Sequence, residues 1–252
     1  MTLDLYLIKK KKLSKYKNIL GVILARGNSK GIKNKNLLKI NGIPLISFSI
    51  NYAKKSKLID RIFVSTDGEG ISKVSKKYGA EIILRPAKLA NDTSSSDSAV
   101  LHAINYVKNN LKYDFDIVVF LQPTTVLRQL GELDLAIKSL VKKKLDTVFS
   151  SVDYHPFLWR KKGKNFFPDN FNPIKRKMSQ NIKTVNETGS YYITKKETFL
   201  NFKNRFGRKI SNFNSDYHSI LEIDKIEDYL YITNLIKTNI PRKYKLCIPL
   251  KK

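Results

Sequence analysis

The feature that most constrains the fold of this chain is a regular alternation of short apolar runs with segments of helical pattern. Apolar runs bounded by turn residues predict strands that are buried on both faces of a sheet. The predicted strands are 19–25, 61–66, 81–84, 116–121, 147–152, 189–194 and 217–223, and the predicted helices include 44–56, 71–78, 130–143, 195–202 and 226–237. Strand, helix and strand repeated at this interval predict an α/β fold, with a mostly parallel sheet and helices on both faces.

The alternation stops between Asp153 and Asn186, in a basic and aromatic segment with three prolines and Trp159. This segment predicts an excursion from the sheet, either a lid, an oligomer arm or a small β subdomain. Residues 1–17 predict a basic, loosely ordered N-terminal extension. The sequence therefore indicates one domain over residues 18–252, with an insertion at about 153–186.

The net charge of +27, from 48 Lys and Arg against 21 Asp and Glu, raises the question of a nucleic-acid partner. The lysines are scattered along the chain, which is typical of a solvated surface, so nucleic acid is not expected. The single cysteine, Cys247, excludes an intramolecular disulfide and a thiolate metal cluster. No apolar run reaches the roughly 18 residues of a membrane span, and the N-terminal charges do not follow the order of a signal peptide. We therefore expect a cytoplasmic protein.

A loop with two glycines follows the first predicted strand. Glycine lets the backbone approach a ligand closely, and exposed N–H groups beside fixed cations bind polyphosphate. The loop lacks the spacing of the P-loop and of the dinucleotide fingerprint. From the residues alone it is either a different phosphate-binding loop or a basic surface turn. Its glycines are Gly27 and Gly31, and its cations are Arg26, Lys30, Lys33 and Lys35.

Polar clusters follow four of the predicted strands. In a parallel sheet the carboxyl ends of the strands meet at one edge, and ligands bind there. Four clusters at the same edge therefore favour a binding site. They are Arg26–Asn36, Asp67, Arg85–Asp97 and Gln122–Arg128.

Two carboxylates, Glu222 and Asp224, stand two residues apart and so on one face of the last predicted strand. Mg²⁺ typically takes one or two carboxylates together with substrate phosphates. The alternative is a solvated strand face on which Asp224 caps the next helix, and the residues alone favour that alternative. The three histidines show no metal-ligand spacing.

Five motifs in a fixed order give the chain a specific resemblance to a known family. They are LARGNSKGIKNKN at 24–36, VSTDG at 64–68, LRPAKLANDTSSSDS at 84–98, LQPTTVLR at 121–128 and ETGSYYI at 187–193, followed by the acidic pair. With them the chain resembles the acylneuraminate cytidylyltransferases, which include CMP-sialic acid and CMP-legionaminic acid synthetases. The resemblance covers residues 19 to about 235. It implies a Rossmann-like (GT-A-like) nucleotidyltransferase fold, CTP as co-substrate, Mg²⁺ as cofactor and a nine-carbon 2-keto sugar acid as acceptor.

In such enzymes the anomeric hydroxyl of the sugar attacks the α-phosphorus of CTP, and pyrophosphate leaves. That chemistry needs the two oxygens in line and the phosphate charge neutralised. By motif position, the resemblance assigns the triphosphate to Arg26, Ser29, Lys35 and Asn36, in a loop shaped by Lys30 and Gly31. It assigns the cytidine pocket to Arg85 and Ser96 with support from Asp67, and the sugar to Gln122, Thr188 and Gly189. It assigns Mg²⁺ to Glu222 and Asp224, with Asp224 the stronger choice, and catalysis to Arg26, Lys35 and Asp224.

Two departures from the family pattern concern the site. Glu222 stands where the sialic acid enzymes commonly have Asp, and its longer side chain bears on the metal ligands. Thr188 stands where many have Asn, and this change bears on the acceptor. The resulting ETGS motif is closer to enzymes for legionaminate-type sugars, which leaves the exact acceptor open. The alternatives are the same reaction on 3-deoxy-octulosonic acid, or a non-catalytic nucleic-acid-binding protein on this fold.

In the family, the excursion after the fifth strand forms a dimer and lends basic residues to the neighbour's sugar site. The resemblance therefore implies a homodimer, with Arg160 and Arg176 as contacts for the sugar carboxylate. A guanidinium suits a carboxylate because it binds in a bidentate manner. The alternative is that both arginines are solvated cations.

Overall fold

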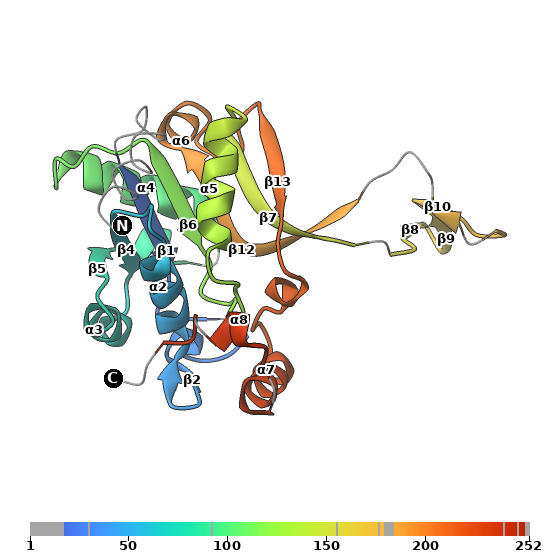
Figure 1. Cartoon of the computed structure of the whole chain (residues 1–252), viewed down its shortest axis with the longest axis horizontal. Coiled ribbons are helices and arrows are strands. Elements are labelled where there is room, and N and C mark those ends of the chain that lie inside the picture. Colours follow the sequence, from blue (N-terminus) through green and yellow to red (C-terminus); the bar gives the residue numbers. More distant parts are fainter. Residues whose placement is uncertain are drawn as a thin grey trace, which may run out of the picture.

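The computed structural model describes residues 18–29, 31–91, 93–154, 156–175, 177–178, 184–238, 240–245 and 247–249. A seven-stranded sheet with helices on both faces forms its centre, which confirms the predicted α/β fold (Figure 1). The strands of this sheet are β1 (Ile19–Leu24), β4 (Arg61–Thr66), β5 (Glu81–Leu84), β6 (Ile117–Leu121), β7 (Thr147–Asp153), β12 (Val185–Lys195) and β13 (Ile210–Asn214). The helices are α2 (Leu45–Lys55), α3 (Glu69–Lys77), α4 (Ser96–Asn109), α5 (Glu132–Lys142), α6 (Lys196–Phe202), α7 (Ile226–Thr238) and α8 (Arg242–Lys245).

The sheet is parallel except at one strand. Its order is β13-β7-β12-β6-β1-β4-β5. β1 pairs in parallel with β4 and β6, whereas β12 runs antiparallel to both β6 and β7. The carboxyl ends of β1, β4, β5 and β6 therefore lie at one edge, and the reversed direction of β12 brings its first half to that same edge.

Two apolar clusters cover the two faces of the sheet. Residues alternate along β1, so Ile19 and Ile23 enter the cluster under α2, α3 and α5, while Leu20 and Val22 enter the cluster under α4 and α6. In α4 the buried residues follow the helical spacing of one apolar stripe; they are Ala99, Val100, Ala103, Ile104 and Val107. Because both faces are covered, the strands need the continuous apolar runs seen in the sequence.

The last predicted strand is wrong. Residues 217–223 form a 3₁₀ helix, η3 (Tyr217–Ile220), followed by a single β-bridge between Thr125 and Glu222. The side chain of Asp216 accepts a hydrogen bond from the N–H of His218, which turns the chain where the strand was expected. The edge strand β13 lies earlier, between the predicted helix 195–202 and the predicted strand 217–223, and pairs in parallel with β7.

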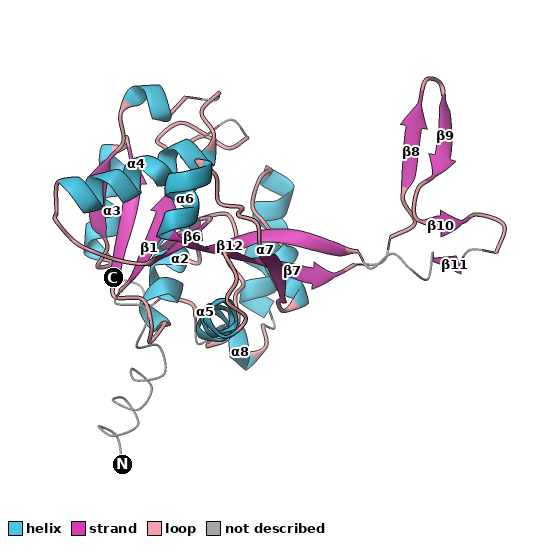
Figure 2. Ribbon diagram, turned by 90° about the horizontal axis from the view of Figure 1, so that it is seen from above, coloured by secondary structure: helices cyan, strands magenta, loops and turns pink. Residues whose placement is uncertain are grey.

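An arm leaves the body between β7 and β12. These two strands continue past the sheet as a ribbon, and the chain between them forms the hairpin of β8 (Trp159–Lys162) and β9 (Asn165–Pro168) and the pair β10 (Phe171–Asn172) and β11 (Lys177–Met178). Figure 2 shows this arm standing well away from the body. Within the part of the chain that the structure describes, no helix has the length and apolarity needed to cross a membrane.

Candidate active site

A pocket of about 320 Å³ opens at the edge where the parallel strands end. Its walls come from the end of β1, the segment after β5, the start of α4 and the end of β6. The lining residues include Arg26, Arg85, Leu89, Asn91, Ser94, Ser95, Ser96, Phe120, Gln122 and Thr124. Three of the four polar clusters predicted to converge at this edge therefore contribute to one cavity.

The glycine- and lysine-rich loop contacts the acidic segment at the far end of the chain. The ammonium of Lys35 lies 2.8 Å from Oδ1 of Asp224. A Cβ on Gly31 would lie 2.3 Å from the backbone oxygen of Asp224, so only glycine allows this approach. The buried Asn36 donates from Nδ2 to the carbonyl oxygen of Arg26 over 3.1 Å, which closes the loop on itself. The glycine- and lysine-rich loop is thus held in direct contact with the acidic segment.

Asp67 supports this loop from the neighbouring strand. The N–H of Gly27 donates to Oδ1 of Asp67 over 2.8 Å. Gly68 lies against Gly27 so closely that a Cβ on Gly68 would be 3.2 Å from the Cα of Gly27. The turn after β4 therefore fixes where the loop after β1 begins.

Arg85 places a buried cation in the pocket wall. Its guanidinium donates to the hydroxyl of Ser65 over 3.2 Å and to the carbonyl oxygen of Ser65, at the end of β4. Burial lowers the pKa of Arg85 to about 10, with Arg26 acting in the same direction and Asp67 opposing it. The side chain remains charged at neutral pH, so the pocket holds a fixed positive charge suited to an anionic ligand.

Arg128, which the sequence analysis did not single out, holds the loop after β6. It is fully buried and donates to the carbonyl oxygens of Gln122, Thr125 and Ser190 and to the hydroxyls of Ser49 and Ser190. These five hydrogen bonds all go to uncharged groups, and burial lowers the pKa of Arg128 to about 10. Arg128 therefore locks the backbone of Gln122 against β12. In the sequence, Arg128 is marked only as the last residue of the LQPTTVLR motif and of the polar cluster Gln122–Arg128.

A bulge in β12 brings Gly189 to Gln122 and Glu222. Glu187 of β12 pairs with Ser151 of β7, and Tyr192 pairs with Phe149. The segment of β12 between these two pairs is therefore longer than the segment of β7 that it faces. Within it Gly189 has φ +63°, and a Cβ there would lie 2.5 Å from Oε1 of Glu222 and 3.0 Å from Oε1 of Gln122. Bulges re-aim a strand in this way beside active sites.

The acidic pair lies in an irregular segment, not on a strand face. Oε1 of Glu222 accepts from the hydroxyls of Thr124 at 3.1 Å and Thr125 at 3.3 Å. Burial raises the pKa of Glu222, and the charge of Asp224 raises it further, although the threonine hydroxyls oppose both effects. Asp228, not Asp224, accepts from the N–H groups of Asp224 and Lys225 before α7. The side chain of Asp224 is therefore free of a capping role.

These two carboxylates suit Mg²⁺. They repel each other, one is exposed and the other half-buried, and Mg²⁺ takes one or two carboxylates beside substrate phosphates and water. Among the described residues no group of three or more His, Cys, Asp or Glu side chains forms a self-sufficient metal site. A cation here would therefore depend on a phosphate ligand for its remaining oxygens.

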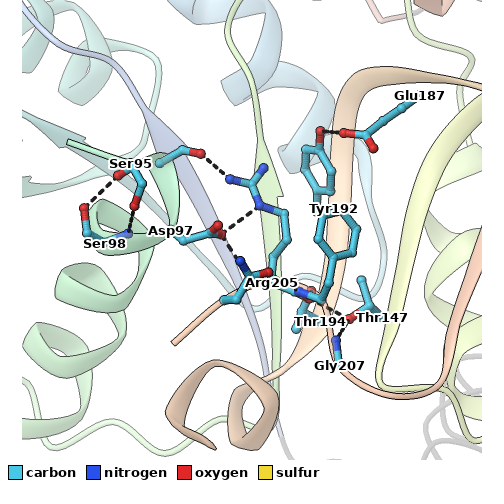
Figure 3. Close-up of polar contacts among 12 residues, drawn as sticks. Ser95, Asp97, Ser98, Thr147, Glu187, Tyr192, Thr194, Arg205 and Gly207 are labelled. Atoms are coloured by element: carbon cyan, nitrogen blue, oxygen red, sulfur yellow. Dashed lines mark hydrogen bonds and ion pairs between the residues drawn. The ribbon is translucent and has the colours of Figure 1, made fainter. Parts of the chain in front are cut away.

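Ser96 lines the pocket, but its hydroxyl is hydrogen-bonded to a residue that does not line the pocket. It accepts from Nη2 of Arg205, a second residue that the sequence analysis missed. Figure 3 shows Arg205 beside Asp97, the next residue of α4. The helix cap at this point is Ser95, whose hydroxyl accepts from the N–H of Ser98 over 3.1 Å. No sequence signal marks Arg205, because its partners lie about a hundred residues earlier in the chain.

The remaining predicted residues are placed differently. Ser29 is half-buried in the loop after β1. Thr188 is buried and donates to the hydroxyl of Ser150 over 2.8 Å, toward β7. Arg160 lies on the arm and pairs with Asp169 at 2.6 Å, so the structure does not bring it to this chain's own pocket. Lys30 and Arg176 lie outside the described residues.

The fold and the edge site agree with a nucleotidyltransferase, and the family match shows this class. The family model described as cytidylyltransferase matches residues 20–245, so this chain belongs to the cytidylyltransferase family. This match and the relatives named below confirm the resemblance stated from the motifs.

Among its relatives, "Post-translational flagellin modification protein B" of Campylobacter coli is 32% identical, over 87% of this chain and 95% of its own length. The N-acylneuraminate cytidylyltransferase of Escherichia coli is 29% identical over 88% of this chain, which spans only 53% of that protein. The CMP-N,N'-diacetyllegionaminic acid synthase of Campylobacter jejuni is 42% identical over 40% of this chain and 43% of its own length. The chain thus spans about half of these last two relatives.

Solved structures support the fold. A CMP:2-keto-3-deoxy-manno-octonic acid synthetase complexed with CTP superposes with a TM-score of 0.67 at 13% identity, over 89% of this chain and 100% of that one. A 4-diphosphocytidyl-2C-methyl-D-erythritol synthase from Anaerococcus prevotii gives a TM-score of 0.64 at 13% identity, over 88% and 96%. At these identities the likeness establishes the architecture alone.

Proposed function

We propose that this protein transfers CMP from CTP to the anomeric hydroxyl of a nine-carbon 2-keto sugar acid of the sialic or legionaminic type. The observation that carries the proposal is the contact between Lys35 and Asp224, since it joins the glycine- and lysine-rich loop to the acidic pair. The other member of that pair, Glu222, accepts from Thr124, which lines the pocket. A nucleotidyltransferase needs its phosphate cations and its metal carboxylates at one place.

The pocket suggests how CTP lies. The cytidine enters between Arg85 and the serines at the start of α4, which line the cavity with polar groups. The triphosphate then extends over the loop after β1, toward Arg26, Lys35 and Asn36. Backbone N–H groups and cations at that loop supply the neutralisation that the leaving pyrophosphate needs.

The acceptor lies on the other side of the α-phosphate, beside Gln122 and the bulge at Gly189. The anomeric oxygen forms a bond to the α-phosphorus while the bond from that phosphorus to the bridging oxygen of pyrophosphate breaks. The hydroxyl proton passes to solvent or to a nearby carboxylate. Mg²⁺ held by Glu222 and Asp224 would supply charge neutralisation on the phosphates. The buried Arg128 keeps Gln122 in register with the attacking hydroxyl.

The type of acceptor rests on the relatives. They include proteins named for N-acylneuraminate and for N,N'-diacetyllegionaminic acid, and the flagellin modification protein whose whole length this chain nearly spans. The neighbour that acts on 2-keto-3-deoxy-manno-octonic acid matches only in fold. We therefore propose a nonulosonic acid as the acceptor, in preference to an eight-carbon acid.

We also propose that the protein works as a homodimer through the arm. Trp159 is 53% exposed there, and Phe166 and Phe167 are exposed on the same hairpin. Aromatic side chains held this far from the body indicate a surface that a second copy covers. In that arrangement Arg160 would lie near the partner's acceptor site.

Pyrophosphate release tests the reaction. The assay contains CTP and Mg²⁺ with N-acetylneuraminate, a di-N-acetyl legionaminate or 3-deoxy-octulosonate as acceptor. We expect release with one of the two nonulosonic acids, and its loss when ATP replaces CTP or when EDTA is added. Release only with 3-deoxy-octulosonate would overturn the acceptor class, and no release with any acceptor would overturn the proposed reaction.

A further inference from the structure

Arg205 lies behind the wall of the pocket without entering it. It follows α6, and only 7% of its surface is exposed. Its carbonyl oxygen accepts from the hydroxyls of Thr147 at 2.6 Å and Thr194 at 3.0 Å, which fixes the backbone to β7 and β12. Figure 3 shows its side chain reaching from these strands to the start of α4. The side chain thus bridges the sheet and the helix that forms one side of the pocket.

The guanidinium holds two consecutive residues of α4. Nε donates to Oδ1 of Asp97 over 2.8 Å, and the backbone N–H of Arg205 reaches the same oxygen at 3.3 Å. Nη2 donates to the hydroxyl of Ser96. The side chains of Arg205 and Asp97 are only 9% and 15% exposed, so this ion pair is sheltered from solvent. A planar fork of donors makes such a double contact, which an ammonium cannot make.

Aromatic rings fix the plane of the guanidinium. Its central carbon lies 4.4 Å from the ring centroid of Tyr192 and 4.9 Å from that of Phe120. Phe120 and Ser96 both line the pocket, so Arg205 contacts two of its walls from outside. Loss of the Arg205 side chain would free the Ser96 hydroxyl and leave Asp97 without its cation.

We infer that Arg205 is a positioning residue for the nucleotide: it holds Ser96 and the first turn of α4 in the place that the cytidine end of CTP requires. The inference rests on the proposed function, since the pocket is taken to hold the cytidine. It predicts a defect in nucleotide binding, not in acceptor binding, because the acceptor lies beyond Gln122.

The variant Arg205→Lys keeps the positive charge but replaces the guanidinium, which contacts both Asp97 and Ser96, with an ammonium that cannot make this double contact. We expect its KM for CTP to rise about tenfold, which is the loss of one hydrogen bond to a charged group, while the KM for the acceptor stays within about twofold. The Kd for CTP, measured by isothermal titration without acceptor, should rise in the same proportion. Arg208→Lys is the matched control, because Arg208 is an exposed arginine three residues away, and it should leave both constants unchanged.

Ser96→Ala provides a second route that leaves the Arg205–Asp97 ion pair in place. It should weaken CTP binding by a similar factor, and Arg205→Lys added to it should cause little further loss, because both changes break one contact. Equal CTP affinity in Arg205→Lys and wild type, or additive losses in the double variant, would overturn the inference. Binding of CTP by a wild type that turns over no acceptor would overturn the proposed reaction and leave this inference standing, and absence of CTP binding would overturn both.

Discussion

At the residue scale, the contact between Lys35 and Asp224 should contribute little to stability, as the proposed catalytic role of both residues requires. The Asp224 side chain is 62% exposed, and exposed ion pairs contribute little to folding. We predict that Lys35→Ala and Asp224→Asn each lower the rate of pyrophosphate release by at least about 100-fold, while the thermal midpoint of unfolding barely changes.

A matched control is Lys73→Ala, which breaks the exposed pair of Lys73 with Glu69 on α3. It should leave both the rate and the thermal midpoint unchanged. Near-normal turnover in both Lys35→Ala and Asp224→Asn would contradict the assignment of the site.

A second residue-scale prediction concerns Glu132, which is buried at the start of α5. Its carboxylate accepts from the hydroxyl of Tyr191 at 2.9 Å and from the N–H of Asp216 at 3.3 Å, yet burial raises the pKa of Glu132 above the ordinary value of 4.5. A raised carboxyl pKa means that the protonated form stabilises the fold, and that this contribution is lost as pH rises from 4.5 through the folded-state pKa.

Glu132→Gln removes this titration. The difference in free energy of unfolding, wild type minus variant, should therefore fall as pH rises from below 4.5 to neutrality. Denaturant unfolding at several pH values measures it. A difference that is constant or that grows with pH would show that the hydrogen bonds, not burial, control this carboxyl group.

The sequence revealed the residues of the site that lie in loops after strands, and missed those that act from a distance. Arg26, Arg85 and Gln122 line one pocket because each follows a parallel strand. Arg128 and Arg205 have roles that depend on partners in other elements, such as Ser190 and Ser96. No spacing along the chain encodes such contacts, so only the tertiary structure reveals them.

At the element scale, apolar runs predicted the central strands well and the edge strand poorly. β1 and β6 are buried on both faces, so nearly every residue in them must be apolar. β13 lies at an edge of the sheet, contains no fully buried residue, and alternates too weakly to signal a strand. Residues 217–223 are apolar enough for a strand, but Asp216 stabilises a 3₁₀ turn instead.

The bulge in β12 leads to an element-scale prediction. Gly189→Ala introduces a left-handed alanine, which costs about 1–2 kcal/mol, and also drives a methyl group against the oxygens of Glu222 and Gln122. We predict a lower thermal midpoint and a loss of most pyrophosphate release.

Gly131→Ala is the control for this prediction, because Gly131 has φ +83° and a Cβ added there would meet nothing within 4 Å. Gly131→Ala introduces the same left-handed backbone strain as Gly189→Ala, but its methyl group does not approach other atoms closely. We expect it to lower the thermal midpoint but to keep turnover. Equal losses of turnover in the two variants would show that strain alone, not contact with the site, explains the effect.

At the scale of the whole molecule, the arm is the feature that a single copy leaves unexplained. The apolar side chains on the arm contact one another, and Trp159 lies 5.3 Å from Phe171 between ring centroids. They gain little burial from the body of this chain, because the arm stands away from it. The proposed dimer covers these side chains and places Arg160 beside the partner's acceptor.

Mixed dimers test this arrangement directly. Arg160→Ala should lower turnover in its own dimer, and so should Lys35→Ala. A dimer with one subunit of each variant keeps one site with an intact loop and an intact arm from the partner, so random mixing should restore roughly a quarter of the wild-type rate. Light scattering would verify dimers, and Leu135→Ser, which changes a residue 57% exposed on the body, should alter neither mass nor rate. Verified mixed dimers without recovered turnover would show that Arg160 does not act on the partner's site, because each such dimer holds one otherwise complete loop and acidic pair.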